Sequence, residues 1–60
     1  MDREELETAL RQLPPRRERI VRLHLAGLKG KEIAARLGIS YELVRQEQRR
    51  ALLQLANILS

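Results

Sequence analysis

The sequence predicts an all-α fold, a small domain of four helices. Apolar residues recur three and four positions apart along most of the chain, and no segment alternates with the period of two that β-strands need. Pro14-Pro15, Gly27, Gly30 and Gly38 divide the chain into helix-length segments. A chain of 60 residues supports one hydrophobic core, so we expect a single domain over residues 1–60.

The first two helices are expected on either side of Pro14-Pro15. Asp2 followed by Glu5 has the pattern of a capping box, so the first helix begins near Asp2 and runs to about Leu13. The two prolines end it, because proline disfavours helical geometry in the residue before it and is well suited to the first position of a new helix. The second helix is expected to cover residues 16 to about 26.

The last two helices are expected to form a helix-turn-helix. Residues 31–37 are good helix formers, and Gly38 supplies a left-handed C-terminal residue. Ser40 is a strong N-cap for a final helix over residues 41 to about 58. Ala34 is small enough for the two helices to pass closely, and the first turns of the final helix then project into a DNA major groove.

The expected core consists of the apolar residues on the inner faces of these helices: Leu6, Leu10, Leu13, Ile20, Val21, Leu25, Leu28, Ile33, Leu37, Ile39, Val44, Leu52 and Leu55. On the final helix the inner face is expected to contain Val44, Gln48, Ala51, Leu52, Leu55, Ile58 and Leu59. Leu53 points away from this face, which leaves two alternatives for it: packing on the first helix, or contact with another protein.

Composition and charge exclude most other functions. The chain has no cysteine, and its single histidine, His24, has no second ligand with which to hold a metal. No apolar stretch approaches the roughly 20 residues needed to cross a bilayer. We therefore expect a cytoplasmic, non-enzymatic protein with no cofactor, metal or membrane partner. Residues 1–15 carry a net charge of −2 and residues 16–60 a net charge of +6, which makes a polyanion the first partner to test.

Three segments of the sequence resemble a known family. They are LPPRRERIVRLHLAGL, KEIAARLGIS and VRQEQRRALLQL, at residues 13–28, 31–40 and 44–55. These segments are similar to region 4 of housekeeping-class bacterial sigma factors, the domain that recognises the promoter −35 element, over about residues 6–55. The resemblance implies a DNA-binding helix-turn-helix domain of bacterial or phage transcription. It also implies docking on the flap of the RNA polymerase β subunit.

The resemblance and the charge pattern together suggest the DNA-binding residues. Glu42, Arg45 and Gln46 stand where family members touch bases or nearby backbone, and a Gln amide or a carboxylate is suited to an adenine or a cytosine edge respectively. On an ordinary surface helix the same residues would only be solvated, and Glu42 would favour the helix dipole. The full set expected on DNA is Arg16, Arg22, His24, Lys29, Lys31, Ser40, Tyr41, Glu42, Arg45, Gln46, Arg49 and Arg50.

Several positions depart from the family's usual pattern. Lys29-Gly30 stand where Ser or Thr is usual, and Tyr41 and Leu43 stand where Arg is usual. Glu47 replaces a usual Ile, so we expect a negative charge on or near the recognition surface, where it would weaken phosphate attraction unless it faces solvent.

Two other functions are compatible with the sequence. One is a stand-alone interaction module of the same fold, which would bind RNA polymerase, an anti-sigma factor or itself through Tyr41, Leu43 and Leu53. The other is the DNA-binding output domain of a response regulator, in which the final helix forms a symmetric dimer. The GLKGKEIAARLGIS stretch is similar in that family.

Overall fold

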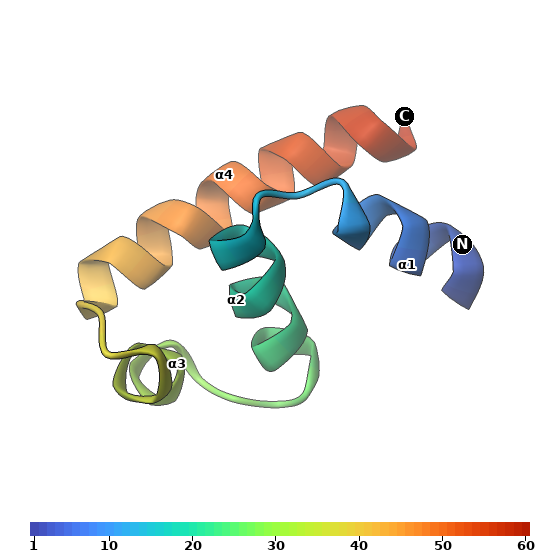
Figure 1. Cartoon of the computed structure of the whole chain (residues 1–60). Helices are drawn as coiled ribbons and strands as arrows, with labels where there is room; N and C mark the ends of the chain where they lie inside the picture. The colour runs from blue at the N-terminus through green and yellow to red at the C-terminus, as the bar shows by residue number, and fades with distance from the viewer.

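The computed structural model describes residues 1–60 and contains four α-helices and no strand (Figure 1). The helices are α1 (Arg3–Arg11), α2 (Pro15–Leu25), α3 (Gly30–Leu37) and α4 (Tyr41–Leu59). The prediction of a small all-α fold is therefore confirmed, and the predicted helix ends lie within two residues of the observed ones. None of these helices combines the length and apolar character needed to cross a membrane.

Local sequence explains where the helices begin. The Asp2 side chain accepts a hydrogen bond from the Glu5 N–H at 2.9 Å and caps α1. Pro15 is the first residue of α2, where its missing N–H leaves no intrahelical bond unmade. The Ser40 hydroxyl accepts from the Leu43 N–H at 3.0 Å and caps α4.

The longest helix, α4, contacts each of the other three. In Figure 1 the N-terminal half of α4 lies beside α3, α2 packs under its middle, and α1 lies near its C-terminal half. The polypeptide therefore builds its core around one helix, whose opposite side is left without a neighbour within the chain.

Two groups of buried residues form the core. The first, which we name the α1 cluster, joins α1 and α2 to the C-terminal half of α4 and consists of Ala9, Leu10, Leu13, Val21, Ala51 and Leu55. The second, the α3 cluster, joins α2 and α3 to the start of α4 and consists of Ile20, Ile33, Ala34 and Val44, with Leu23, Leu28, Leu37 and Ile39 packed against it. Because α2 and α4 contribute to both clusters, each holds the other in place.

Two residues expected in the core are exposed instead. Leu25 is 58% exposed and Leu52 is 65% exposed, so both predictions were wrong. At about 100° per residue, Leu25 lies about 140° around α2 from Ile20, and Leu52 lies about 80° around α4 from Val44. Leu23 faces the α3 cluster in place of Leu25.

Candidate nucleic-acid interface

The turn between α3 and α4 has the geometry that a helix-turn-helix requires. Gly38 adopts the left-handed conformation, with φ 68° and ψ 34°. The Ile39 N–H donates to the Ala34 carbonyl at 3.1 Å, and the Ile39 side chain packs against the α3 cluster. Ser40 then caps α4. These contacts form a turn of three residues between α3 and α4 and fix the direction in which α4 leaves it.

Tight packing holds α3 against α4. Ile33 and Val44 are fully buried, and Ala34 is 7% exposed between the two helices. A larger side chain at Ala34 would push α4 outward, because the interior has no room to spare. The α3 cluster therefore presents α4 at a defined angle, with its far side open.

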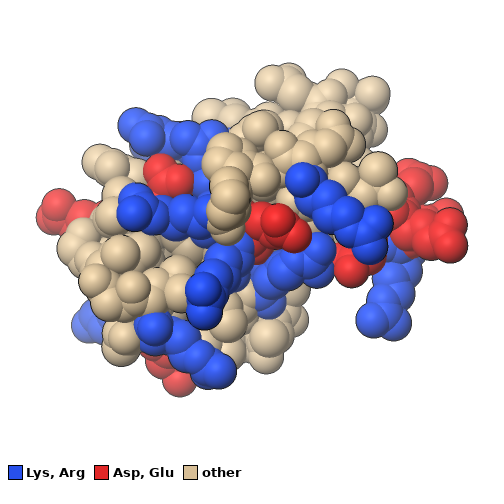
Figure 2. Space-filling model, in the orientation of Figure 1, with Lys and Arg blue, Asp and Glu red and all other residues tan.

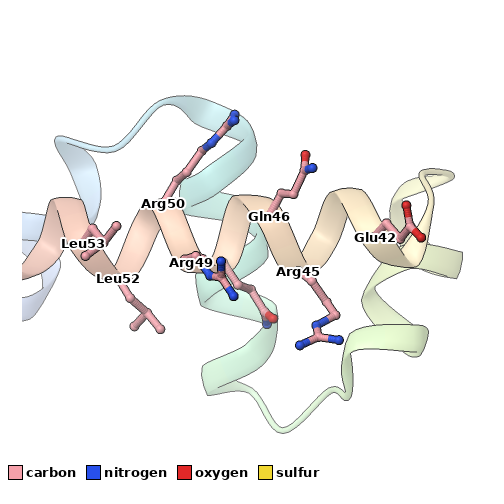
Figure 3. Close-up of a pocket in the computed structure, with 8 residues that line it drawn as sticks. Glu42, Arg45, Gln46, Arg49, Arg50, Leu52 and Leu53 are labelled. Atoms are coloured by element: carbon pink, nitrogen blue, oxygen red, sulfur yellow. The ribbon is translucent and has the colours of Figure 1, made fainter.

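The far side of α4 carries mostly charged and polar side chains. Two exposed leucines follow them toward the C-terminal half of the helix. A shallow groove runs along it, lined by Glu42, Arg45, Gln46, Gln48, Arg49, Arg50, Leu52 and Leu53. Gln48, expected on the inner face, is half-buried at the edge of this groove. Figure 3 shows Gln46 and Arg50 projecting from one side of α4, and Arg45 and Leu52 from the other. We call Glu42, Arg45, Gln46, Arg49 and Arg50, all of them exposed, the polar face of α4.

Tyr41 contacts both helices of the motif. Its ring covers Gly30 so closely that a Cβ added at Gly30 would lie 2.7 Å from the Tyr41 Cε1 atom. The Arg45 guanidinium stands over the same ring, 5.9 Å from its centroid. Tyr41 is still 42% exposed, so it both packs on α3 and stays accessible beside the polar face.

The other residues expected on DNA lie on α2 and around the start of α3. Arg16 is exposed in the first turn of α2, His24 is exposed near the end of α2, and Lys29 and Lys31 are exposed at the start of α3. The Lys29 N–H donates to the Glu32 carboxylate at 2.8 Å, which is one half of a capping box, while the Lys29 side chain cannot accept a backbone N–H as a Ser or Thr hydroxyl does. Contact of these four residues with DNA stays a prediction.

Arg22 differs from this group because it already has two partners. Its guanidinium donates to Glu7 of α1 at 2.8 Å and to Glu18 of α2 at 3.0 Å. These two hydrogen bonds, that to Glu7 first, raise the pKa of Arg22 above its usual value. Arg22 therefore links α1 to α2, and a phosphate would have to compete with two carboxylates for it.

The position of Glu47 differs from the one predicted from the sequence. We expected its charge on or near the recognition surface, yet the residue is only 8% exposed and lies on the inner side of α4. Its carboxylate accepts from Arg17 of α2 at 3.0 Å and from Arg50 at 3.5 Å. The negative charge is thus neutralised between α2 and α4 rather than directed at DNA.

Arg17 is a residue that the sequence analysis missed. Its guanidinium bridges Glu47 and Gln54, with a second hydrogen bond of 3.1 Å to the Gln54 side chain. Helical spacing could have indicated it, since Arg17 lies between Ile20 and Val21 around α2 and therefore on the apolar stripe. A charged residue on an inner stripe implies an internal partner.

The three residues expected in protein contacts have different environments. Leu43 is partly buried, Tyr41 packs on Gly30, and Leu53 is 64% exposed. Leu53 lies about 180° around α4 from Val44, so it does not pack on α1. Together with Leu52 it forms an apolar end to the groove on α4.

The charge distribution separates the two ends of the molecule. Figure 2 shows Lys and Arg side chains spread over much of the visible face, with the largest group of Asp and Glu at the side where Figure 1 places the N-terminus. Asp2, Glu4, Glu5 and Glu7 lie in or just before α1. A polyanion would therefore approach the molecule away from the start of α1.

Comparison with known proteins agrees with this geometry. The family described as Sigma-70, region 4 matches residues 3–55, which include the helix-turn-helix and most of α4. Searches of curated proteins and of solved structures give no match. Members of this family are DNA-binding helix-turn-helix domains of transcription. Because the match covers most of the 60 residues, the chain belongs to the sigma-70 region 4 family.

Proposed function

We propose that this chain binds promoter DNA with a −35-like element in the manner of housekeeping-class sigma factors, with the start of α4 in the major groove. The observation that carries the proposal is the polar face of α4, which follows the Gly38 turn and has no neighbour within the chain. A major groove admits one helix, and a helix held by its opposite side against α2 and α3 is free to enter it.

The proposed contacts fall into two classes. Arg16, Lys29 and Lys31 would neutralise phosphates, and the N-termini of α2 and α3 would add their positive ends. Glu42, Arg45 and Gln46 would read base edges, as the resemblance to the family implies, because these three side chains reach out from the first turns of α4. Arg49 and Arg50 lie further along α4, where they would reach the DNA phosphates beside the bases that are read.

The test is a binding measurement on two duplexes at two salt concentrations. Fluorescence anisotropy would compare a −35-containing duplex with a scrambled one at about 50 and 200 mM salt, where phosphate contacts weaken steeply and base contacts do not. Tighter binding to the −35 duplex at both concentrations supports the proposal. Equal binding to both duplexes contradicts base reading, and no binding at either salt contradicts the DNA function altogether.

Two variants separate the two classes of contact. Gln46→Ala should reduce affinity for the −35 duplex and leave the scrambled duplex almost unchanged, because a base contact is lost. Lys31→Ala should weaken both duplexes equally and reduce the salt dependence by about one phosphate contact. Equal effects of the two variants on both duplexes would contradict the assignment of roles.

A second candidate function is docking on a protein, which the exposure of Leu52 and Leu53 supports. They project to different sides of α4 at the end of the groove, and exposed apolar residues of this kind can mark protein contacts. The resemblance to sigma region 4 makes the RNA polymerase β flap the first partner to test, with an anti-sigma factor or a second copy as alternatives. Sedimentation equilibrium at micromolar concentration separates a monomer from the symmetric dimer of a response-regulator domain.

A further inference from the structure

Glu47 lies between two arginines that differ in their surroundings. Its side chain is 11% exposed. Arg17, 24% exposed, donates to it from α2 at 3.0 Å and is held a second time by Gln54. Arg50, 58% exposed, reaches it at 3.5 Å from the next turn of α4. One carboxylate therefore neutralises an interior arginine and also holds an arginine of the polar face.

Breaking the ion pair with Glu47 costs more free energy for Arg17 than for Arg50. Arg17 has two hydrogen-bond acceptors and little access to water, so removing its partner would leave a partly buried charge unpaired. The pair with Arg50 is longer and more exposed, and pairs of this kind contribute little to stability. Arg50 is therefore the partner that a phosphate can take from Glu47.

Arg49 can be compared directly with Arg50. It stands beside Arg50 on the same polar face, is also exposed, and is part of no ion pair within the chain. A phosphate that contacts Arg49 meets an uncompensated charge. A phosphate that contacts Arg50 must compete with the Glu47 carboxylate.

We propose that Glu47 limits the DNA affinity of the polar face by holding Arg50 in an internal ion pair. This inference rests on the proposed DNA function and adds a residue that regulates it. Arg50 would then contribute less counterion release than a free arginine, whatever the DNA sequence. Glu47 would lower affinity for all duplexes alike and leave the ratio between specific and scrambled DNA unchanged.

The central experiment replaces Glu47 by glutamine. Glu47→Gln keeps the shape of the side chain and an oxygen that accepts from Arg17, but it removes the charge that holds Arg50. Anisotropy titrations of the −35 and scrambled duplexes should show about three- to tenfold tighter binding of both at about 50 mM salt. The slope of log affinity against log salt should steepen by up to about 0.9, the value for one further phosphate contact.

Two backgrounds separate release of Arg50 from other effects of losing a negative charge. In an Arg50→Gln background, Glu47→Gln should no longer tighten binding, because no arginine is freed at the polar face. In the matched Arg49→Gln background the tightening should remain. Arg17→Gln breaks the same contact between α2 and α4 but leaves Glu47 to hold Arg50, so a purely structural role for Glu47 predicts that Arg17→Gln and Glu47→Gln change binding alike.

Each outcome decides a different question. Tightening by Glu47→Gln that persists in the Arg50→Gln background overturns the inference, as does unchanged or weaker binding by a folded Glu47→Gln variant. If circular dichroism shows that Glu47→Gln is unfolded, the double variant Arg17→Met, Glu47→Met, which removes both charges of the pair and frees Arg50, carries the same test. Failure of the unmodified chain to bind either duplex would instead overturn the proposed DNA function, and this inference with it.

Discussion

The two halves of α4 have different neighbours and different outer surfaces. Residues 41–50 pack through Val44 on the α3 cluster and present charged and polar side chains outward. Residues 51–59 pack through Ala51 and Leu55 on the α1 cluster and present Leu52 and Leu53 outward. A single continuous helix thus presents a surface suited to DNA and a surface suited to protein, and the neighbour on its inner side differs between the halves.

The polar network of Arg17 joins these halves. Glu47 belongs to the first half of α4 and Gln54 to the second, and the same guanidinium of α2 binds both. The hydrogen bonds need one particular register of α2 against α4. One side chain of α2 therefore holds both halves of α4 in place.

The largest expected loss of stability comes from creating a cavity in either cluster. Ile33→Ala in the α3 cluster and Leu10→Ala in the α1 cluster should each reduce the free energy of unfolding by about 2–5 kcal/mol. A domain of this size has about 3–5 kcal/mol in total, so both variants should be largely unfolded, as urea titration followed by circular dichroism would show. If Leu10→Ala frays α1 while amide protons of α3 stay protected from exchange, the two clusters are independent.

The next largest loss of stability is expected at the turn that leads into the first half of α4. Gly38→Ala should cost about 1–2 kcal/mol, because an L-residue is disfavoured at φ 68° and no atom lies close enough for a clash to add to the cost. Gly30→Ala is the comparison at an ordinary φ, where the substitution brings no backbone strain and its effect comes from displacement of the Tyr41 ring. Thermal unfolding that finds Gly38→Ala neutral would contradict the role of the turn.

A smaller effect compares the caps of the two regions. Ser40→Ala and Asp2→Ala each remove a side-chain acceptor from a helix start, at a cost of about 1 kcal/mol for a cap in a structured region. Ser40 lies inside the helix-turn-helix, so its loss should lower the midpoint of urea unfolding. Asp2 caps the exposed first turn of α1, where fraying of that turn absorbs part of the loss. A larger destabilisation by Asp2→Ala would reverse this assignment.

The smallest effect concerns the apolar surface of the second half. Leu52→Gln and Leu53→Gln should change the free energy of unfolding by less than about 0.5 kcal/mol, because both side chains are exposed. Leu55→Gln is the matched control, since the same substitution there places an amide in the α1 cluster. Substantial destabilisation by Leu53→Gln would mean that this leucine packs within the chain, and chemical denaturation measures the difference.

Helical periodicity predicted the fold class and most of the core, but not every residue of it. It identified Leu10, Ile20 and Val44 because these lie at the centres of their stripes. It failed for Leu25 and Leu52, because a stripe on one helix does not show how much of its edge a crossing helix covers. Most of the candidate DNA-binding residues were predictable as exposed because they lie opposite the stripe.

The sequence by itself determined the four helices, their ends and the turn, because caps, prolines and a left-handed glycine act through bonds within a few residues. Only the tertiary structure decided the environment of Glu47, Arg17 and Arg22. Whether a charge on a helix faces water, DNA or another charge depends on which helix crosses it and at what register, and the partners of Glu47 and Arg22 include residues far away in the chain.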